Sequence, residues 1–126
     1  MKLTDIIYIA GHRGLAGSAI WRHLEKAGYQ NLVGLSSAEL DLTNRAAVFE
    51  AIQRISPDVV IDAAAKGGGI HANDPYPAEF LSDNLQIQVN LMDAANAAGV
   101  DRLFFLGSSC IYPKFAQQPI AESSLL

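Results

Sequence analysis

Three glycines, Gly11, Gly14 and Gly17, follow a short apolar run at intervals of three residues. The run, residues 6–10, has the β-branched composition of a strand, and the residues after the glycines have the spacing of a helix. Glycine permits a tight turn, a close approach of backbone to phosphate, and close packing of the helix near the strand. The free N–H groups of the helix's first turn favour an anion. The spacing therefore predicts a strand–turn–helix unit that binds the pyrophosphate of a dinucleotide.

A second group of chemically capable side chains follows the apolar run at 102–106, in the order Gly107, Ser108, Ser109, Cys110. The serine hydroxyls could donate hydrogen bonds to a substrate carbonyl or a cofactor, or could simply end a strand and cap a turn. The Cys110 thiol could serve as an acid/base if its pKa were lowered, or could be a small hydrophobe. No second cysteine or histidine cluster accompanies it, so the sequence predicts no metal site.

The choice between NADP and NAD depends on the residues near the 2′ position of the adenosine ribose. NAD sites usually carry an acid at the end of the second strand, about 20 residues beyond the glycines. Residues 34–37 read Gly-Leu-Ser-Ser there, without an acid. Arg13 could hold a 2′-phosphate through its permanent charge, or could be an ordinary exposed arginine. We expect NADP in preference to NAD, with NAD still possible. His12, His23 and His71 receive no chemical role from their residue type.

Strand and helix patterns alternate along the chain in the order β-α-β-α-β-α-β, which predicts an α/β fold: a Rossmann-type, doubly wound parallel sheet with helices on both faces. Ligands of such sheets bind at the carboxyl ends of the strands. Asp62 is expected to be a buried cap at one strand end, and Asp41 or Thr43 to cap the second helix. The expected strands span 6–10, 31–35, 58–65 and 102–106, the helices about 16–27, 44–56 and 78–98, and the long loop 66–77.

The apolar face of the expected helix at 78–98 is unusually wide. Such a face packs against a sheet and a neighbouring helix, or forms a subunit interface. One stripe contains Leu81, Leu85, Met92 and Ala95, and a second contains Ile87, Leu91, Ala94 and Ala98.

Composition limits the class of protein further. The chain has 126 residues, a net charge of −4 and one cysteine. This composition suits one domain in a reducing cytoplasm and argues against a nucleic-acid surface, a membrane span or a disulfide framework.

Several longer strings carry a resemblance to a known family. They cover residues 11–20, 63–70, 73–78 and 106–114, and residues 118–123 continue them. The most specific are Ala-Ala-Ala-Lys-Gly-Gly-Gly-Ile at 63–70 and Gly-Ser-Ser-Cys-Ile-Tyr-Pro at 107–113. With them the sequence resembles the extended short-chain dehydrogenase/reductase family, and within it the N-terminal part of the GDP-4-keto-6-deoxy-D-mannose epimerase-reductases. The resemblance implies epimerisation of a GDP-linked 4-keto sugar, followed by reduction of its ketone with NADPH.

The resemblance also implies roles for individual residues. Ser108 would hydrogen-bond the ketone oxygen, Cys110 would be an acid/base in epimerisation, and Asn84 would help to order the site. A GDP-sugar is the implied substrate, and a homodimer through the wide-faced helices is the implied assembly. The implied cofactor-binding residues are Gly11, His12, Arg13, Gly14, Leu15, Ala16, Gly17, Ser37, Ala38, Glu39, Leu40, Asp41, Leu42, Ala63, Ala64, Leu106, Gly107 and Ser109.

Two departures from the family pattern lead to further expectations. The family commonly has arginine at the position of Ser37, where it binds the 2′-phosphate. Its proton donor is a tyrosine with a lysine four residues later, and no tyrosine here has lysine at that offset. We expect that pair beyond this sequence, so that residues 1–126 form an incomplete NAD(P)-binding domain that is inactive alone. The alternatives are a stand-alone dinucleotide-binding module without catalysis, or another NAD(P)-dependent nucleotide-sugar epimerase or dehydratase.

Overall fold

The computed structural model describes residues 1–66 and 77–125. Most of the predicted loop at 66–77, including His71, lies outside these described residues. The strands within them are β1 (Ile7–Ala10), β2 (Leu32–Val33), β3 (Val59–Asp62) and β4 (Arg102–Phe105). They form a parallel four-stranded sheet in the order β2-β1-β3-β4, with Ile7 paired to both Leu32 and Val59. The predicted Rossmann-type α/β class is confirmed.

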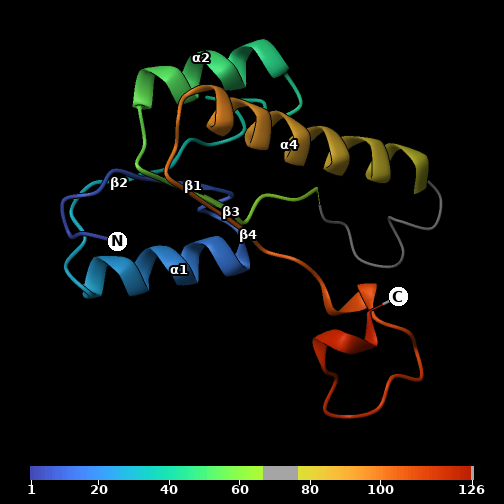
Figure 1. The fold of residues 1–126 in the computed structure, drawn as a ribbon. Coiled ribbons are helices and arrows are strands. Elements are labelled where there is room, and N and C mark those ends of the chain that lie inside the picture. Colours follow the sequence, from blue (N-terminus) through green and yellow to red (C-terminus); the bar gives the residue numbers. More distant parts are fainter. Residues whose placement is uncertain (67–76, 126) are drawn as a thin grey trace.

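Helices cover both faces of the sheet, as Figure 1 shows. Helix α1 (Leu15–Lys26) lies on one face, and α2 (Arg45–Ile55) and α4 (Pro77–Ala97) lie side by side on the other. Successive strand residues point to opposite faces, so β1 and β3 contribute to two separate cores. Ile7, Ile9, Val59 and Ile61 pack against α1, whereas Tyr8, Ala10 and Val60 pack beneath α2 and α4.

The strands are shorter than the apolar runs predicted. The run at 31–35 contributes only the two residues of β2, and the run at 58–65 pairs only as far as Asp62. Ala63 still donates its amide to the carbonyl of Ala10 at 3.1 Å, but the chain then leaves the ladder. The ends of the apolar runs therefore form the carboxyl edge of the sheet rather than strand.

The predicted cap of α2 is wrong. Asn44 is the N-cap, and its side chain accepts a hydrogen bond from the amide of Ala47 at 3.1 Å. Asp41 instead accepts from the amide and the hydroxyl of Thr43, at 2.9 and 2.7 Å. Both predicted residues are thus engaged in the turn before the helix, because an aspartate bonds readily to the backbone two residues on.

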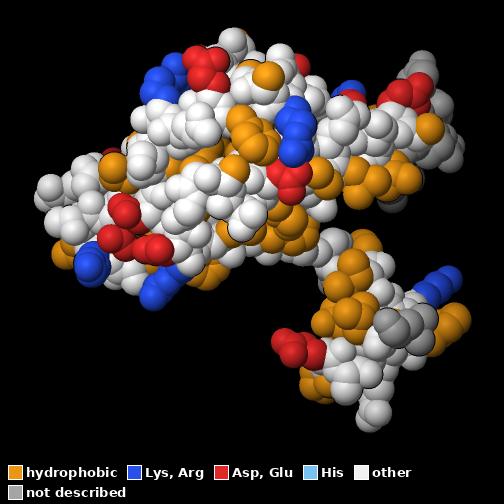
Figure 2. Space-filling model, turned by 45° about the horizontal axis from the view of Figure 1, so that its top comes forward, with side chains coloured by type: hydrophobic (Ala, Val, Ile, Leu, Met, Phe, Trp, Pro, Cys, Tyr) orange, Lys and Arg blue, Asp and Glu red, His pale blue; other side chains and the backbone are white. Residues whose placement is uncertain are grey.

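The two apolar stripes of α4 have different environments. Ile87, Leu91 and Ala94 are buried in the core. Leu81 and Leu85 are 63% and 49% exposed. Figure 2 shows hydrophobic side chains gathered along this side of the long helix. The stripe that contains Ile87 therefore packs against the sheet and α2. In the other expected stripe Leu81, Leu85 and Met92 remain on the surface, but Ala95 is buried in the core, so that part of the expectation is wrong.

The chain after β4 runs away from the sheet (Figure 1) and contains two short 3₁₀ turns, Ser109–Ile111 and Glu122–Ser124. Phe104 and Phe105 of β4, and Leu106 just after it, remain more than two-fifths exposed. No described residue after β4 belongs to either core, so this segment adds little to them.

The closest backbone approach around the turn is between α1 and the residue that begins the turn. A Cβ added to Gly17 would collide with the carbonyl oxygen of Gly11, which is backbone and cannot move aside. Gly17→Ala should therefore lower the free energy of unfolding by about 2–3 kcal/mol, the upper part of the range for overpacking. Urea unfolding followed by circular dichroism measures this change. Gly14→Ala is the matched control, since its Cβ would meet only the Gly11 oxygen at 3.2 Å, and a loss as large as that of Gly17→Ala would contradict the steric argument.

Candidate functional site

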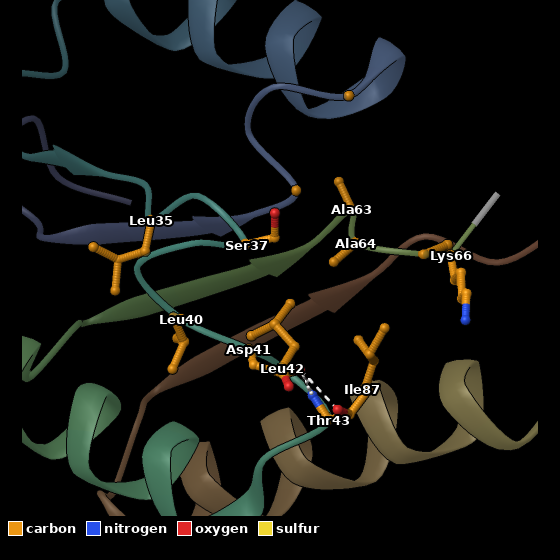
Figure 3. Close-up of a pocket in the computed structure, with 13 residues that line it drawn as sticks. Leu35, Ser37, Leu40, Asp41, Leu42, Thr43, Ala63, Ala64, Lys66 and Ile87 are labelled. Carbon is orange, nitrogen blue, oxygen red and sulfur yellow. Dashed lines mark hydrogen bonds between the residues drawn. The ribbon is translucent and has the colours of Figure 1, made fainter.

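A cleft of about 310 Å³ opens at the carboxyl ends of β1 and β3. Its size lies at the lower end of the range for small-molecule sites. Figure 3 shows Leu35 and Ser37 on one side, Ala63 and Ala64 at the end of β3, and Ile87 of α4 across the opening. The lining residues are Gly11, Gly14, Leu35, Ser37, Leu40, Asp41, Leu42, Thr43, Ala63, Ala64, Ala65, Lys66 and Ile87.

The glycine turn has the geometry that the spacing predicts. Gly11 has a φ of +74°, and a Cβ on it would lie 2.5 Å from the carbonyl oxygen of Ala63. Glycine at residue 11 therefore permits both the positive φ of the turn and the close contact with the residue after β3. Glycine at residue 17 permits α1 to pack against the Gly11 backbone. The amide of Gly14 donates to the Gly11 carbonyl at 2.9 Å. That amide is engaged inside the turn, so an anion would be bound by the amides that follow it.

The first turn of α1 is free of competing groups. Gly14 is its N-cap, no side chain caps the helix, and no acidic residue lies in the first turn. The first amide after Gly14 to reach a backbone carbonyl is that of Ser18, which donates to Gly14 at 2.9 Å. The amides of Leu15, Ala16 and Gly17 belong to the orphan donors of a helix start, where the helix dipole is positive. This end of α1 suits an anion such as pyrophosphate.

A smaller cavity of about 230 Å³ lies next to the main cleft, with which it shares Gly11, Gly14, Leu35 and Ser37. Arg13 is exposed there, and Ser36 and Ser37 contribute from the end of β2. The guanidinium is thus near the part of the sheet where a Rossmann site binds the adenosine ribose.

His12 has a packing role at the base of this cavity. A Cβ on Gly34 would collide with the His12 ring, so the imidazole lies directly over the Gly34 backbone. On its other side the ring is tilted against Trp21, with 5.5 Å between ring centroids. His12 lines the smaller cavity but not the main cleft, and it holds the glycine turn against β2 and α1.

The wall formed by Ala63 and Ala64 is held by Asp62, whose side chain is buried as expected of a strand-end cap. Its Oδ1 accepts a hydrogen bond from the Ala64 amide at 3.1 Å, and its Oδ2 is buried without a partner among the described residues. Burial raises the pKa of Asp62, and the Ala64 bond lowers it less. Burial, and then the charge of Asp62, raise the pKa of the neighbouring Tyr8 to about 12.

The far end of the cleft is fixed to α4 through Lys66. Asn84 accepts a hydrogen bond from the Lys66 amide at 2.7 Å and donates to its carbonyl at 3.3 Å. The Lys66 ammonium pairs with Asp83 at 2.5 Å and lies 5.6 Å from the centroid of the Phe80 ring. In Figure 3 the Lys66 side chain points toward α4 rather than into the cleft. Asn84 therefore orders the backbone at the edge of the cleft.

Ser108 and Cys110 follow β4 at the same carboxyl edge but do not line the cleft. Both are exposed, and the Ser108 hydroxyl accepts a hydrogen bond from the Cys110 amide at 3.1 Å. Leu106 donates its amide to the Asp62 carbonyl at 3.2 Å, which ties the start of this segment to β3. The roles expected of Ser108, Cys110, Leu106, Gly107 and Ser109 remain predictions.

The structure brings together eight of the expected cofactor-binding residues in the main cleft and adds others. Leu15, Ala16, Gly17, Ala38 and Glu39 lie outside the lining of both cavities. Leu35, Thr43, Ala65, Lys66 and Ile87 were not expected. The continuous run 63–66 could have indicated Ala65 and Lys66, but Ile87 reaches the cleft only through the packing of α4. The expected residues in the main cleft are Gly11, Gly14, Ser37, Leu40, Asp41, Leu42, Ala63 and Ala64.

The described residues contain neither a metal-binding cluster nor a helix that could span a membrane. Within 1–66 and 77–125, no group of three or more His, Cys, Asp or Glu side chains is arranged to hold a metal ion. In the same part of the chain, no helix has the length and apolar character needed to cross a membrane.

The parallel sheet, its helices on both faces and the glycine turn define a Rossmann-type α/β protein. The model of the NAD dependent epimerase/dehydratase family matches residues 7–126, and the chain belongs to this family. It is 59% identical over 120 residues to GDP-L-fucose synthase 1 of Arabidopsis thaliana, and 53% identical over 122 residues to the GDP-L-fucose synthase of Escherichia coli K12. Each match covers 95% of this chain and only 37% of the relative.

Solved structures of similar proteins have the same fold. The protein described as DdhaC superposes with a TM-score of 0.96 at 47% identity, over 100% of this chain and 36% of its own. The GDP-mannoheptose C4 reductase MlghC of Campylobacter jejuni, solved with NADP bound, has a TM-score of 0.92 at 38% identity, over 99% of this chain and 40% of its own. The chain thus spans about two-fifths or less of these proteins.

Because burial raises the pKa of Asp62, the free energy of unfolding should depend on pH. Because its folded pKa is raised, its favourable contribution is complete below the ordinary aspartate pKa of about 3.9 and is lost as pH rises through the raised value. Asp62→Asn cannot ionise, so it should melt at a higher temperature than the unmodified chain at pH 8, and the difference should close toward pH 4. Thermal unfolding across this pH range checks the trend, with the exposed Asp101→Asn as control. A variant that is less stable at pH 8 would show that the Asp62 carboxylate stabilises the fold.

Proposed function

We propose that this chain is the NADP(H)-binding part of a GDP-L-fucose synthase, an enzyme that epimerises and reduces GDP-4-keto-6-deoxy-D-mannose. The observation that carries the proposal is the start of α1, which no side chain of the described residues caps and whose N-cap Gly14 lines the main cleft. The identities of 59% and 53% to GDP-L-fucose synthases support this substrate. A GDP-L-colitose synthase is 36% identical, so GDP is common to relatives that differ in the sugar.

The residues present fit a dinucleotide. Gly14 lines the cleft, and the only atom of the described residues within 4 Å of a Cβ added to it would be the Gly11 carbonyl oxygen, at 3.2 Å. The amides of Leu15, Ala16 and Gly17 would hold the pyrophosphate, Leu40 to Leu42 the adenosine, and Ala63 to Lys66 the nicotinamide half. Arg13 would bind the 2′-phosphate, which favours NADP over NAD. NADPH then supplies a hydride to the sugar ketone.

Ser108 and Cys110 are proposed to act on the sugar. The Ser108 hydroxyl donates a hydrogen bond to the ketone oxygen, which polarises the carbonyl and acidifies the neighbouring C–H groups. Cys110 transfers a proton at an epimerised carbon. Support comes from their place at the carboxyl edge after β4, two residues apart and on the exposed surface. The tyrosine and lysine that complete the reaction in this family are not in this sequence.

A homodimer is part of the proposal. The exposed stripe of α4, formed by Leu81, Leu85, Val89 and Met92, is apolar and continuous along the helix. Apolar surface of this kind is typical of subunit contacts. The opposite stripe already packs on α2 and the sheet, so a second copy would cover the side of α4 that this chain leaves exposed.

Cofactor binding tests the proposal directly. Titration of the chain with NADPH, followed by quenching of its single tryptophan, should give saturable binding. Gly14→Ala should weaken that binding by about tenfold or more, equivalent to about 1.4 kcal/mol, because the added methyl group occupies space beside the pyrophosphate. Ala19→Val, on the exposed side of the same helix, is the control and should bind as the unmodified chain does. Unmodified protein that binds neither NADPH nor NADH would overturn the proposed function.

The role of Cys110 predicts a selective kinetic defect in the full-length protein that contains this chain. Cys110→Ser should slow epimerisation by about 100-fold or more, the usual contribution of one acid/base group. Reduction of a ketone that is already epimerised should change far less. Solvent deuterium incorporation at the epimerised carbons, compared with NADPH oxidation, separates the two steps. Equal losses in both steps would remove Cys110 from this role.

A further inference from the structure

The loop after β2 returns an acidic side chain to the end of that strand. The Glu39 Oε2 atom accepts hydrogen bonds from the amide and the hydroxyl of Ser36, both at 2.7 Å. The amides of Glu39 and Leu40 in turn donate to the Ser36 carbonyl, at 3.0 and 2.9 Å. These reciprocal bonds hold the carboxylate beside Ser36, although residues 34–37 contain no acid. The two bonds engage one carboxylate oxygen, which leaves Oε1 outside this arrangement.

Ser36 also connects Glu39 to the smaller cavity. Ser36 and Ser37 line that cavity together with Arg13. The hydrogen bonds from Ser36 are the main reason that the pKa of Glu39 is lowered, and the charges of Arg13 and His12 lower it further. The carboxylate is therefore ionised at neutral pH, and its bonds to Ser36 hold it beside the cavity that Ser36 and Arg13 line, although Glu39 itself does not line it.

The two charges have opposite consequences for the ribose 2′ position. A cation binds the 2′-phosphate of NADP, whereas a carboxylate accepts a hydrogen bond from the 2′-hydroxyl of NAD and repels a phosphate. We propose that Glu39 is a specificity-determining residue, whose carboxylate at the end of β2 offsets Arg13 and allows the chain to bind NAD(H) as well as NADP(H). This inference rests on the proposed dinucleotide function and extends it to cofactor selectivity.

A purely structural role for Glu39 predicts a different outcome. The hydrogen bonds to Ser36 require an acceptor oxygen, and a glutamine side-chain oxygen is also an acceptor. Glu39→Gln thus keeps the loop and removes the charge. If Glu39 served only the loop, this substitution would leave the selectivity between the two cofactors unchanged.

The experiment measures dissociation constants for NADPH and NADH by tryptophan quenching, in the unmodified chain, Glu39→Gln and Glu39→Ala. Glu50→Gln, which removes an equal charge from the exposed side of α2, is the matched control. Glu39→Gln should tighten NADPH and weaken NADH, and raise the NADH-to-NADPH ratio of dissociation constants by about three- to tenfold, a change typical of one partly screened charge. Glu39→Ala should shift the ratio in the same direction, and Glu50→Gln should not shift it.

The ratio separates the possible failures. An unchanged ratio in Glu39→Gln, or an equal weakening of both cofactors, would overturn the role of Glu39 while leaving dinucleotide binding intact. The same shift in Glu50→Gln would show an effect of net charge and would also overturn it. If the unmodified chain bound neither cofactor, the proposed function would fail, and this inference would fail with it.

Discussion

The backbone contact between Gly11 and Gly17 is the constraint on which the site depends. The Gly11 carbonyl lies so close to α1 that any side chain at residue 17 would collide with it, and Gly11 itself abuts the carbonyl of Ala63. The turn is thereby wedged between the first turn of α1 and the end of β3. These two contacts fix the start of α1, at Gly14, beside the cleft. They also place Ala63 and Ala64, which line the cleft, next to the glycine turn. Without these contacts, the two halves of the site would not meet.

The order of the elements could be predicted from the sequence, but their ends could not. Hydrophobic periodicity reports burial rather than strand pairing, so residues 34–35 and 63–65 continue the apolar runs past the last paired residues, Val33 of β2 and Asp62 of β3. The N-cap of α2 was predicted wrongly because Asp41, Thr43 and Asn44 each have a side chain that can accept the hydrogen bond of an N-cap. Asp41 is engaged by Thr43, which leaves Asn44 for the helix.

The parts of the site that are local in sequence were predicted best. The glycine turn and the loop at 40–42 line the cleft because each is determined by its own chain geometry. Ile87 reaches the site only through the packing of α4, which a strand-and-helix pattern does not specify. Glu39 is the clearest example of a residue whose place the sequence does not specify. Residues 34–37 contain no acid, and only the fold of the loop brings the Glu39 carboxylate to Ser36.

The charges around the cleft are largely engaged by neighbours within the chain. Lys66 pairs with Asp83, and Asp62 is buried below the wall. An incoming pyrophosphate would therefore gain little from these side chains. The amides at the start of α1 have no such competitor, since neither a capping side chain nor an acid is present in the first turn. The proposed binding of an anion here consequently depends on the backbone, whereas the side chains after β2 are the ones proposed to distinguish one dinucleotide from another.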